Sequence, residues 1–235
     1  NSVGVLQWLE EAGGTGDDEC KALSISGNNL FLTGDIQPPS AMFGTHNVTG
    51  VANADGFLAK YDLSGTNLWA LRMGGSESDH GISVSADANG NSYATGIVVK
   101  TASFGNGKTI AAGNFDQVYI AKYDAAGLCQ WAKKCGNPGA VGNFAADIAT
   151  DDNGYSLITG TFKGSATFGP FTVASSGMKD AYIAKYDPQG NCQFAKHGGG
   201  VGDDNGSACE WIPNNNFVIS GGYQNTASFD SWNVN

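Results

Sequence analysis

One hairpin-like segment returns along this 235-residue chain at a nearly constant interval. It reads FLAKYDLSGTNLW at 57–69, YIAKYDAAGLCQW at 119–131 and YIAKYDPQGNCQF at 182–194. Its lysines, Lys60, Lys122 and Lys185, lie 62 and 63 residues apart. Three further markers keep the same period: an aromatic residue (Trp8, Trp69, Trp131, Phe194), a Thr/Ser–Gly pair and an Ala-x-Phe element. A repeat of this length predicts a fold built from equivalent units.

Each unit carries the patterns of four strands. FLAKYD and NLWALRMG flank a turn at LSGT, and GISVSAD alternates apolar and serine residues with period two. SYATGIV follows an Asn-Gly dipeptide, which suits a two-residue hairpin turn. A connector with the Ala-x-Phe element comes next, and no segment shows the helical period of 3.6.

Four antiparallel strands per repeat are typical of a β-propeller blade. A β-solenoid is the rival fold, but its coils are usually shorter and lack repeated tight hairpins. We therefore predict an all-β fold, a single β-propeller region over 1–235, with units at about 1–56, 57–117, 118–180 and 181–235. Small residues should let neighbouring blades approach near the axis, while Trp, Tyr and Phe fill the wider outer gaps. Three AKYD segments serve four units, so we expect the chain to be part of a larger propeller or array.

The net charge of −10 disfavours nucleic acid and anionic membrane as partners. No run of 18 apolar residues is present, so we expect no membrane insertion. The five cysteines form no CxxC pair, which leaves a zinc site without support. Because their number is odd, at least one thiol is free or pairs outside the chain.

The motifs AKYDLSGTNLWALRMGG, DANGNSYATG and TASFG together resemble the SBBP repeats of bacterial secreted and surface proteins, a propeller-type family. The resemblance covers essentially the whole chain. It implies a secreted or cell-surface location of the Bacteroidota type, and it implies an architecture more than an activity.

Carboxylates gather on the Gly-rich loops GGTGDDE, GGSESDH and GGGVGDDN. As Ca²⁺ takes roughly six to eight oxygen ligands, these residues are candidate calcium ligands: Asp17, Asp18, Asp79, Asp203 and Asp204. The alternative, which we favour, is that Asp accepts hydrogen bonds from backbone N–H groups in a tight turn. The third unit reads CGNPGAVGNF and has no acid there, which argues against a strictly repeated metal site.

Other polar motifs have structural interpretations. DANGN at 87–91 and DDNGY at 151–155 lack the flanking helices and the Glu of an EF-hand, so we interpret them as hairpin turns. His46, His80 and His197 read as isolated, solvated loop residues. The repetition of AKYD indicates a structural part in every blade. Trp211 and Trp232 lie off the consensus and are candidates to stack on sugar rings.

These observations predict a non-enzymatic extracellular or cell-surface module that acts as a scaffold, an adhesive or a protein-interaction unit, with no catalytic residues. Its partners would be surface proteins, glycans or further blades of the same polypeptide, with Ca²⁺ as the one cofactor considered. A lectin-like, carbohydrate-binding propeller is the alternative. A propeller hydrolase or lyase is a third hypothesis, and it would need paired carboxylates at the central channel.

Overall fold

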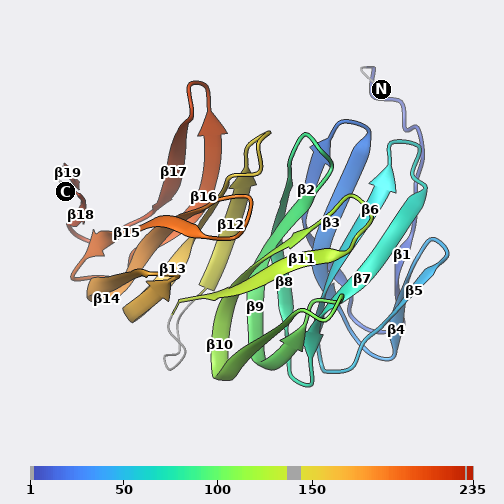
Figure 1. Cartoon of the computed structure of the whole chain (residues 1–235), viewed down its shortest axis with the longest axis horizontal. Helices are drawn as coiled ribbons and strands as arrows, with labels where there is room; N and C mark the ends of the chain where they lie inside the picture. Colours follow the sequence, from blue (N-terminus) through green and yellow to red (C-terminus); the bar gives the residue numbers. More distant parts are fainter. Residues whose placement is uncertain (1–2, 137–143, 231, 235) are drawn as a thin grey trace.

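The structure is a computed structural model that describes residues 3–136, 144–230 and 232–234, the last three by their backbone alone. Every regular element in these ranges is a β-strand, which confirms the all-β prediction (Figure 1). Accordingly, the described residues contain no helix that could cross a membrane.

Three antiparallel groups of four strands follow one another along the chain, and we call them the first, second and third sheets. A short pairing of the ends of β7 and β9 connects the first two. The first contains β2 (Glu19–Ser26), β3 (Asn29–Ile36), β6 (Asp55–Asp62) and β7 (Asn67–Gly75). The second contains β8 (His80–Ala86), β9 (Ser92–Ser103), β10 (Thr109–Tyr123) and β11 (Cys129–Cys135). The third contains β12 (Phe144–Thr150), β13 (Ser156–Phe168), β14 (Phe171–Tyr186) and β15 (Cys192–Gly200).

The fourth unit contributes a two-stranded sheet within the described residues, β16 (Asn205–Ile212) with β17 (Asn216–Gly222). Five short strands complete the fold: β1 (Ala12–Gly14), β4 (Ser40–Phe43), β5 (His46–Thr49), β18 (Ala227–Phe229) and β19 (Trp232–Val234). Strand pairing also groups the strands differently from the sequence units. The GISVSAD and SYATGIV strands pair with the AKYD and Trp strands of the following unit, so each four-stranded sheet draws on two adjacent units.

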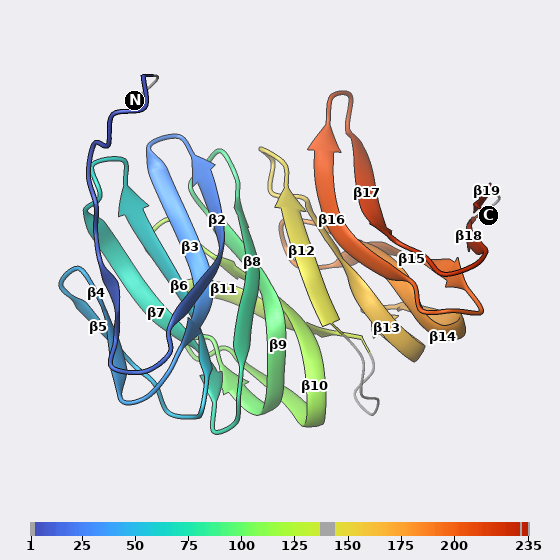
Figure 2. The ribbon, with the colours of Figure 1, turned by 180° about the vertical axis from the view of Figure 1, so that it is seen from behind.

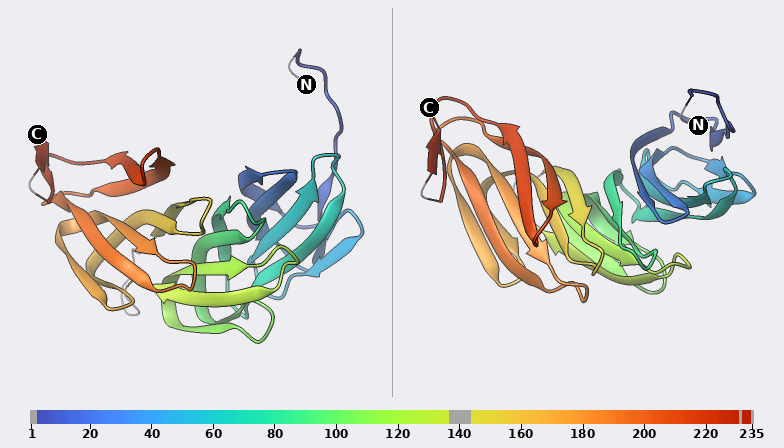
Figure 3. Two further views of the ribbon diagram at one scale, coloured as in Figure 1. Left: turned by 45° about the horizontal axis from the view of Figure 1, so that its top comes forward. Right: turned by 90° about the horizontal axis from the view of Figure 1, so that it is seen from above.

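The sheets pack face to face in an open arc whose two ends carry the chain termini (Figure 3, left). Figure 2 shows the same succession, from β2 to β17, from behind. One apolar core fills the gap between the first and second sheets, another that between the second and third, and a smaller one that between the third sheet and β16–β17.

The innermost strands, β2, β8, β12 and β16, lie side by side. Small residues allow this approach. A Cβ added to Gly81 would lie 2.3 Å from Thr33 Oγ1, and one added to Gly206 would lie 2.1 Å from Thr159 Oγ1. The Thr-Gly pair of one sheet therefore meets a glycine of the next, in agreement with the predicted crowding near the axis.

The first two repeated hairpins are joined, through their Trp and Lys side chains, to the hairpin turn of the following sheet. The Trp131 indole lies over the turn of the third sheet, where a Cβ on Gly190 would be 2.8 Å from the ring. Trp131 Nε1 and Lys122 Nζ both donate to the carbonyl of Pro188, at 3.1 and 3.3 Å. Trp69 and Lys60 make the same two bonds to Ala125. The AKYD hairpin of the second sheet thus takes part in two such joints, one with each neighbouring sheet, which supports its structural interpretation.

Candidate functional site

The predicted loop carboxylates join neighbouring sheets. One oxygen of Asp79 accepts from the N–H of Gly75 at 2.5 Å, and the other from the N–H of Val99 at 2.8 Å. Asp18 bonds Gly14 and Gln37 in the same way, and Asp204 bonds Gly200 and Gln224. Each carboxylate therefore ties the last residue of one strand (β1, β7 or β15) to a backbone N–H later in the chain, as the backbone-capping interpretation predicts.

The described residues contain no cluster of side chains of the kind that the calcium prediction requires. Among the described residues, no group of three or more His, Cys, Asp or Glu side chains is arranged to hold a metal ion. Asp17 is exposed. The backbone of Asp203 forms an isolated β-bridge with that of Lys179, and one carboxylate oxygen of Asp203 is buried without a hydrogen-bond partner. The oxygens of Asp18, Asp79 and Asp204 accept backbone hydrogen bonds, as in the capping interpretation. Calcium binding by these residues stays a prediction. Most of the matching loop of the third unit lies outside the described residues.

Asp79 is the most perturbed of these acids. It is completely buried, and burial raises its pKa from an ordinary value of 3.8 to about 6, against the lowering effect of its two backbone hydrogen bonds. The nearby carboxylate of Asp55 raises the pKa further, and His80 lowers it. A Cβ on Gly74 would lie 2.3 Å from Asp55 Oδ1 and 3.0 Å from Asp79 Oδ2, so two buried acids share the space beside a glycine.

We expect the stability of the chain to depend on the titration of Asp79. Because the folded-state pKa lies above the unfolded value, the protonated form favours folding, and this contribution is lost as the pH rises through about 4 to 6. The free energy of unfolding of the wild type, relative to an Asp79→Asn variant, should therefore be larger at pH 4.5 than at pH 7.5. Urea titrations of both proteins at the two pH values measure it. A constant difference would contradict the burial of a titrating carboxylate.

A second polar cluster spans the first and second sheets. His80 Nδ1 lies 2.7 Å from Asp35 Oδ2, and Lys21 contacts the same oxygen. Asp35 is 8% exposed, and its other oxygen is buried without a partner. In the third sheet His197 Nδ1 lies 3.0 Å from Asp180 Oδ2, with Asp180 Oδ1 likewise unpartnered.

The prediction of isolated, solvated loop histidines is therefore wrong. His46 and His80 begin β5 and β8, and His197 lies within β15. His80 and His197 are half-buried, and each ring lies against a buried aspartate: Asp35 of the first sheet for His80 and Asp180 of the same sheet for His197.

The innermost strands place a single carboxylate at their shared bulge. The register of β2, β8, β12 and β16 shifts before Ala22, Ser83, Asp147 and Ala208 respectively. Asp147 accepts from Ser83 Oγ at 2.8 Å and from the Cys209 N–H at 2.9 Å. A bulge re-aims side chains, yet these four positions carry one acid and not the pair that a propeller hydrolase would need.

The remaining predicted positions have structural contacts. Asp87 and Asp151 close hairpin turns by accepting backbone N–H groups two and four residues later, which confirms the turn interpretation. The Trp211 indole donates to the carbonyl of Ala149 at 3.2 Å and packs against Phe217. Lys185 lies 4.9 Å from the Trp211 ring centroid. Trp211 is thus partly used in packing, and the side chain of Trp232 lies outside the described residues.

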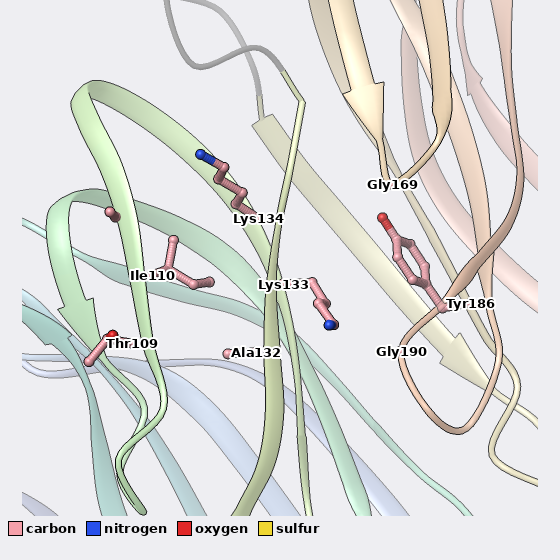
Figure 4. A pocket seen from close by; sticks show the side chains of 9 residues that line it. Thr109, Ile110, Ala132, Lys133, Lys134, Gly169, Tyr186 and Gly190 are labelled. Atoms are coloured by element: carbon pink, nitrogen blue, oxygen red, sulfur yellow. The ribbon is translucent and has the colours of Figure 1, made fainter.

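A groove of about 340 Å³ opens on the outer side, between the second and third sheets. Lys133 and Lys134 line one wall, and the turn at Gly190 lies opposite (Figure 4). Successive strand residues point to opposite faces, and in Figure 4 the two lysines point apart, so they do not converge on one ligand. The Tyr186 hydroxyl at the groove is engaged with Cys135 Sγ at 3.0 Å.

The thiols divide into one accessible and four buried groups. All five are free, and Cys20 is exposed. Burial raises the pKa of Cys192 to about 11 and the pKa of the other three buried thiols to about 12: Cys129, Cys135 and Cys209. Because the thiolate is the reactive form, we expect an aromatic disulfide reagent at pH 8 to label one thiol in the native chain and five in urea. Rapid native labelling of more than one would contradict this packing.

Comparison with known proteins gives distant relatives. No family model matches the sequence. An uncharacterized WD repeat-containing protein of Acanthamoeba polyphaga mimivirus is 26% identical over 204 residues, 71% of this chain and 14% of the relative. The regulatory protein FlaEY of Caulobacter vibrioides is 25% identical over 215 residues, 87% of this chain and 22% of the relative. The chain therefore spans less than a quarter of either protein.

Proposed function

We propose that the chain is a run of β-propeller blades that acts as a rigid, non-enzymatic scaffold for binding other proteins. The observation that carries the proposal is the use of the repeated residues. Trp and Lys of the first two hairpins, the turn glycines that they meet and the loop aspartates all join one sheet to the next. We therefore expect a partner to be bound by the side chains that differ between the units. The similarity to a WD repeat-containing protein supports a propeller that binds proteins.

The surface that best suits a protein partner lies near the connectors. Phe115 and Met178 occupy equivalent positions, two residues before Gln117 of the second sheet and Asp180 of the third. They are 45% and 52% exposed. Exposed apolar side chains on adjacent rigid elements are typical of protein-interaction sites. A secreted or cell-surface location belongs to the same proposal and rests on the resemblance to SBBP repeats.

Selection of binders from a displayed random-peptide library tests this function. We expect the selected peptides to lose at least tenfold in affinity for a Phe115→Ser/Met178→Ser variant. A matched control, Leu63→Ser/Leu128→Ser, changes two residues of similar exposure in the hairpin turns of the first two sheets, and it should bind normally. Equal losses for both variants would argue against the connector surface. Saturable binding to a glycan array, with none to peptides, would favour the lectin alternative.

A further inference from the structure

Among the described residues, the β17 strand has a free edge at the position where the other sheets continue with a third strand. In the three four-stranded sheets the second strand pairs with a third: β3 with β6, β9 with β10 and β13 with β14. Within the described ranges β17 occupies the second position, yet it pairs with β16 alone. An edge of this kind presents backbone N–H and C=O groups to an incoming strand.

The three precedents also define an aromatic contact. The third strand places an aromatic residue opposite the glycine of the Thr-Gly pair: Phe57 opposite Gly34, Tyr119 opposite Gly96 and Tyr182 opposite Gly160. That ring packs against the phenylalanine of the Ala-x-Phe element that precedes it in the chain. The centroids are 4.7 Å apart for Phe57 and Phe43, 4.8 Å for Tyr119 and Phe104, and 4.8 Å for Tyr182 and Phe168.

The fourth unit has equivalents of the two residues that flank this ring, the glycine and the phenylalanine. Gly221 and Phe229 are the equivalents of the glycine and the phenylalanine, and both line a cavity of about 480 Å³ together with Ala181 and Ile219. Phe43, Phe104 and Phe168 are at most 2% exposed, whereas Phe229 is only half-buried. The cavity adjoins a second one of about 330 Å³, lined in part by Phe194 and Phe217. Room for an aromatic side chain therefore exists beside an unpaired strand edge.

We propose that β17 is an acceptor for an added β-strand, and that its occupant is an extended segment with the pattern aromatic–apolar–Ala–Lys–Tyr–Asp. The segment runs antiparallel to β17, with its aromatic residue opposite Gly221 and inside the cavity beside Phe229. The same register places its lysine opposite Val218, because Lys60 pairs with Phe31, Lys122 with Tyr93 and Lys185 with Leu157. Main-chain bonds supply affinity and the aromatic pocket supplies specificity, as in other cases of strand addition.

A labelled synthetic peptide with the sequence of residues 57–66, FLAKYDLSGT, tests the proposal by fluorescence anisotropy against the whole chain. We expect saturable binding that falls at least tenfold when the first Phe of the peptide is replaced by Ala. Methylation of alternate backbone nitrogens along the strand edge of the peptide should also abolish it. Both changes lie in the peptide, so they leave the folding of the chain untouched.

On the protein side, Phe229→Ala should weaken binding, while Phe144→Ala, an exposed phenylalanine on β12, should not. Binding that tolerates N-methylation, or no saturable binding at millimolar peptide, would overturn the proposal. Sedimentation gives an independent check. A dimer of the chain that Phe229→Ala dissociates, with no peptide binding, would assign the edge to a second copy and overturn the stated occupant.

Discussion

Replacing Trp131 by alanine is expected to lower the free energy of unfolding by about 2–3 kcal/mol, because one side chain performs several tasks at the joint between the second and third sheets. Its ring packs 6.2 Å from that of Tyr93 and covers Gly190, and its indole N–H donates to the carbonyl of Pro188. Loss of the ring removes its apolar contacts. It also leaves the Pro188 carbonyl with one of its two side-chain donors, Lys122 Nζ.

A double-mutant cycle with Gly190 sharpens this test. Gly190 has φ +82°, and its added Cβ would meet the Trp131 ring, so Gly190→Ala should destabilise the chain by both backbone strain and a clash. In a Trp131→Ala background only the strain remains, and the cost of Gly190→Ala should be smaller. Urea denaturation of the four proteins measures the coupling. Strictly additive costs would show that the ring and the turn do not share this contact.

The strands of the repeat were predictable because their signals are local. FLAKYD, NLWALRMG, GISVSAD and SYATGIV correspond to β6, β7, β8 and the start of β9. Their grouping into sheets was not predictable, since a periodic series of four strands reads the same whichever strand is placed first. The choice depends on contacts such as Gly81 against Thr33, which join residues of different units.

The candidate site divides in the same way. The capping role of Asp79 followed from its place in a Gly-rich turn, whereas the Asp35–His80 pair joins residues 45 positions apart that break the consensus. One signal was present in the sequence. His80 is the equivalent of Glu19 in the next unit, and Glu19 is the cross-strand partner of Asp35. Alignment of the units therefore brings both residues to one end of the inner strands, but only the packing of adjacent sheets shows that they touch.

Asp55→Ala is the second substitution for which we expect a large effect, about 3 kcal/mol of lost stability. Asp55 is completely buried at the start of β6, and its Oδ1 accepts from Arg72 Nη1 at 2.7 Å. Its Oδ2 accepts from the N–H groups of Val51 and Ala52, at 2.6 and 3.2 Å. The variant leaves two backbone donors without their acceptor and the Arg72 guanidinium with the Gly75 carbonyl in place of a carboxylate. Unmade bonds of buried groups are costly.

The exposed ion pair between Glu77 and Lys100 provides the matched control, because its side chains are 36% and 53% exposed. Glu77→Ala should cost at most about 1 kcal/mol, since water solvates and screens such a pair. Asp55→Ala also removes a negative charge that raises the pKa of Asp79, so the pH window of the Asp79 contribution should shift downward in this variant. Equal costs for the two variants in urea, with an unchanged pH window, would contradict the buried arrangement. A larger loss of stability for Asp55→Ala, together with a lower pH range for the Asp79 contribution, would show that Asp55 and Asp79 act at one junction between sheets. Two buried carboxylates then help to hold this junction together.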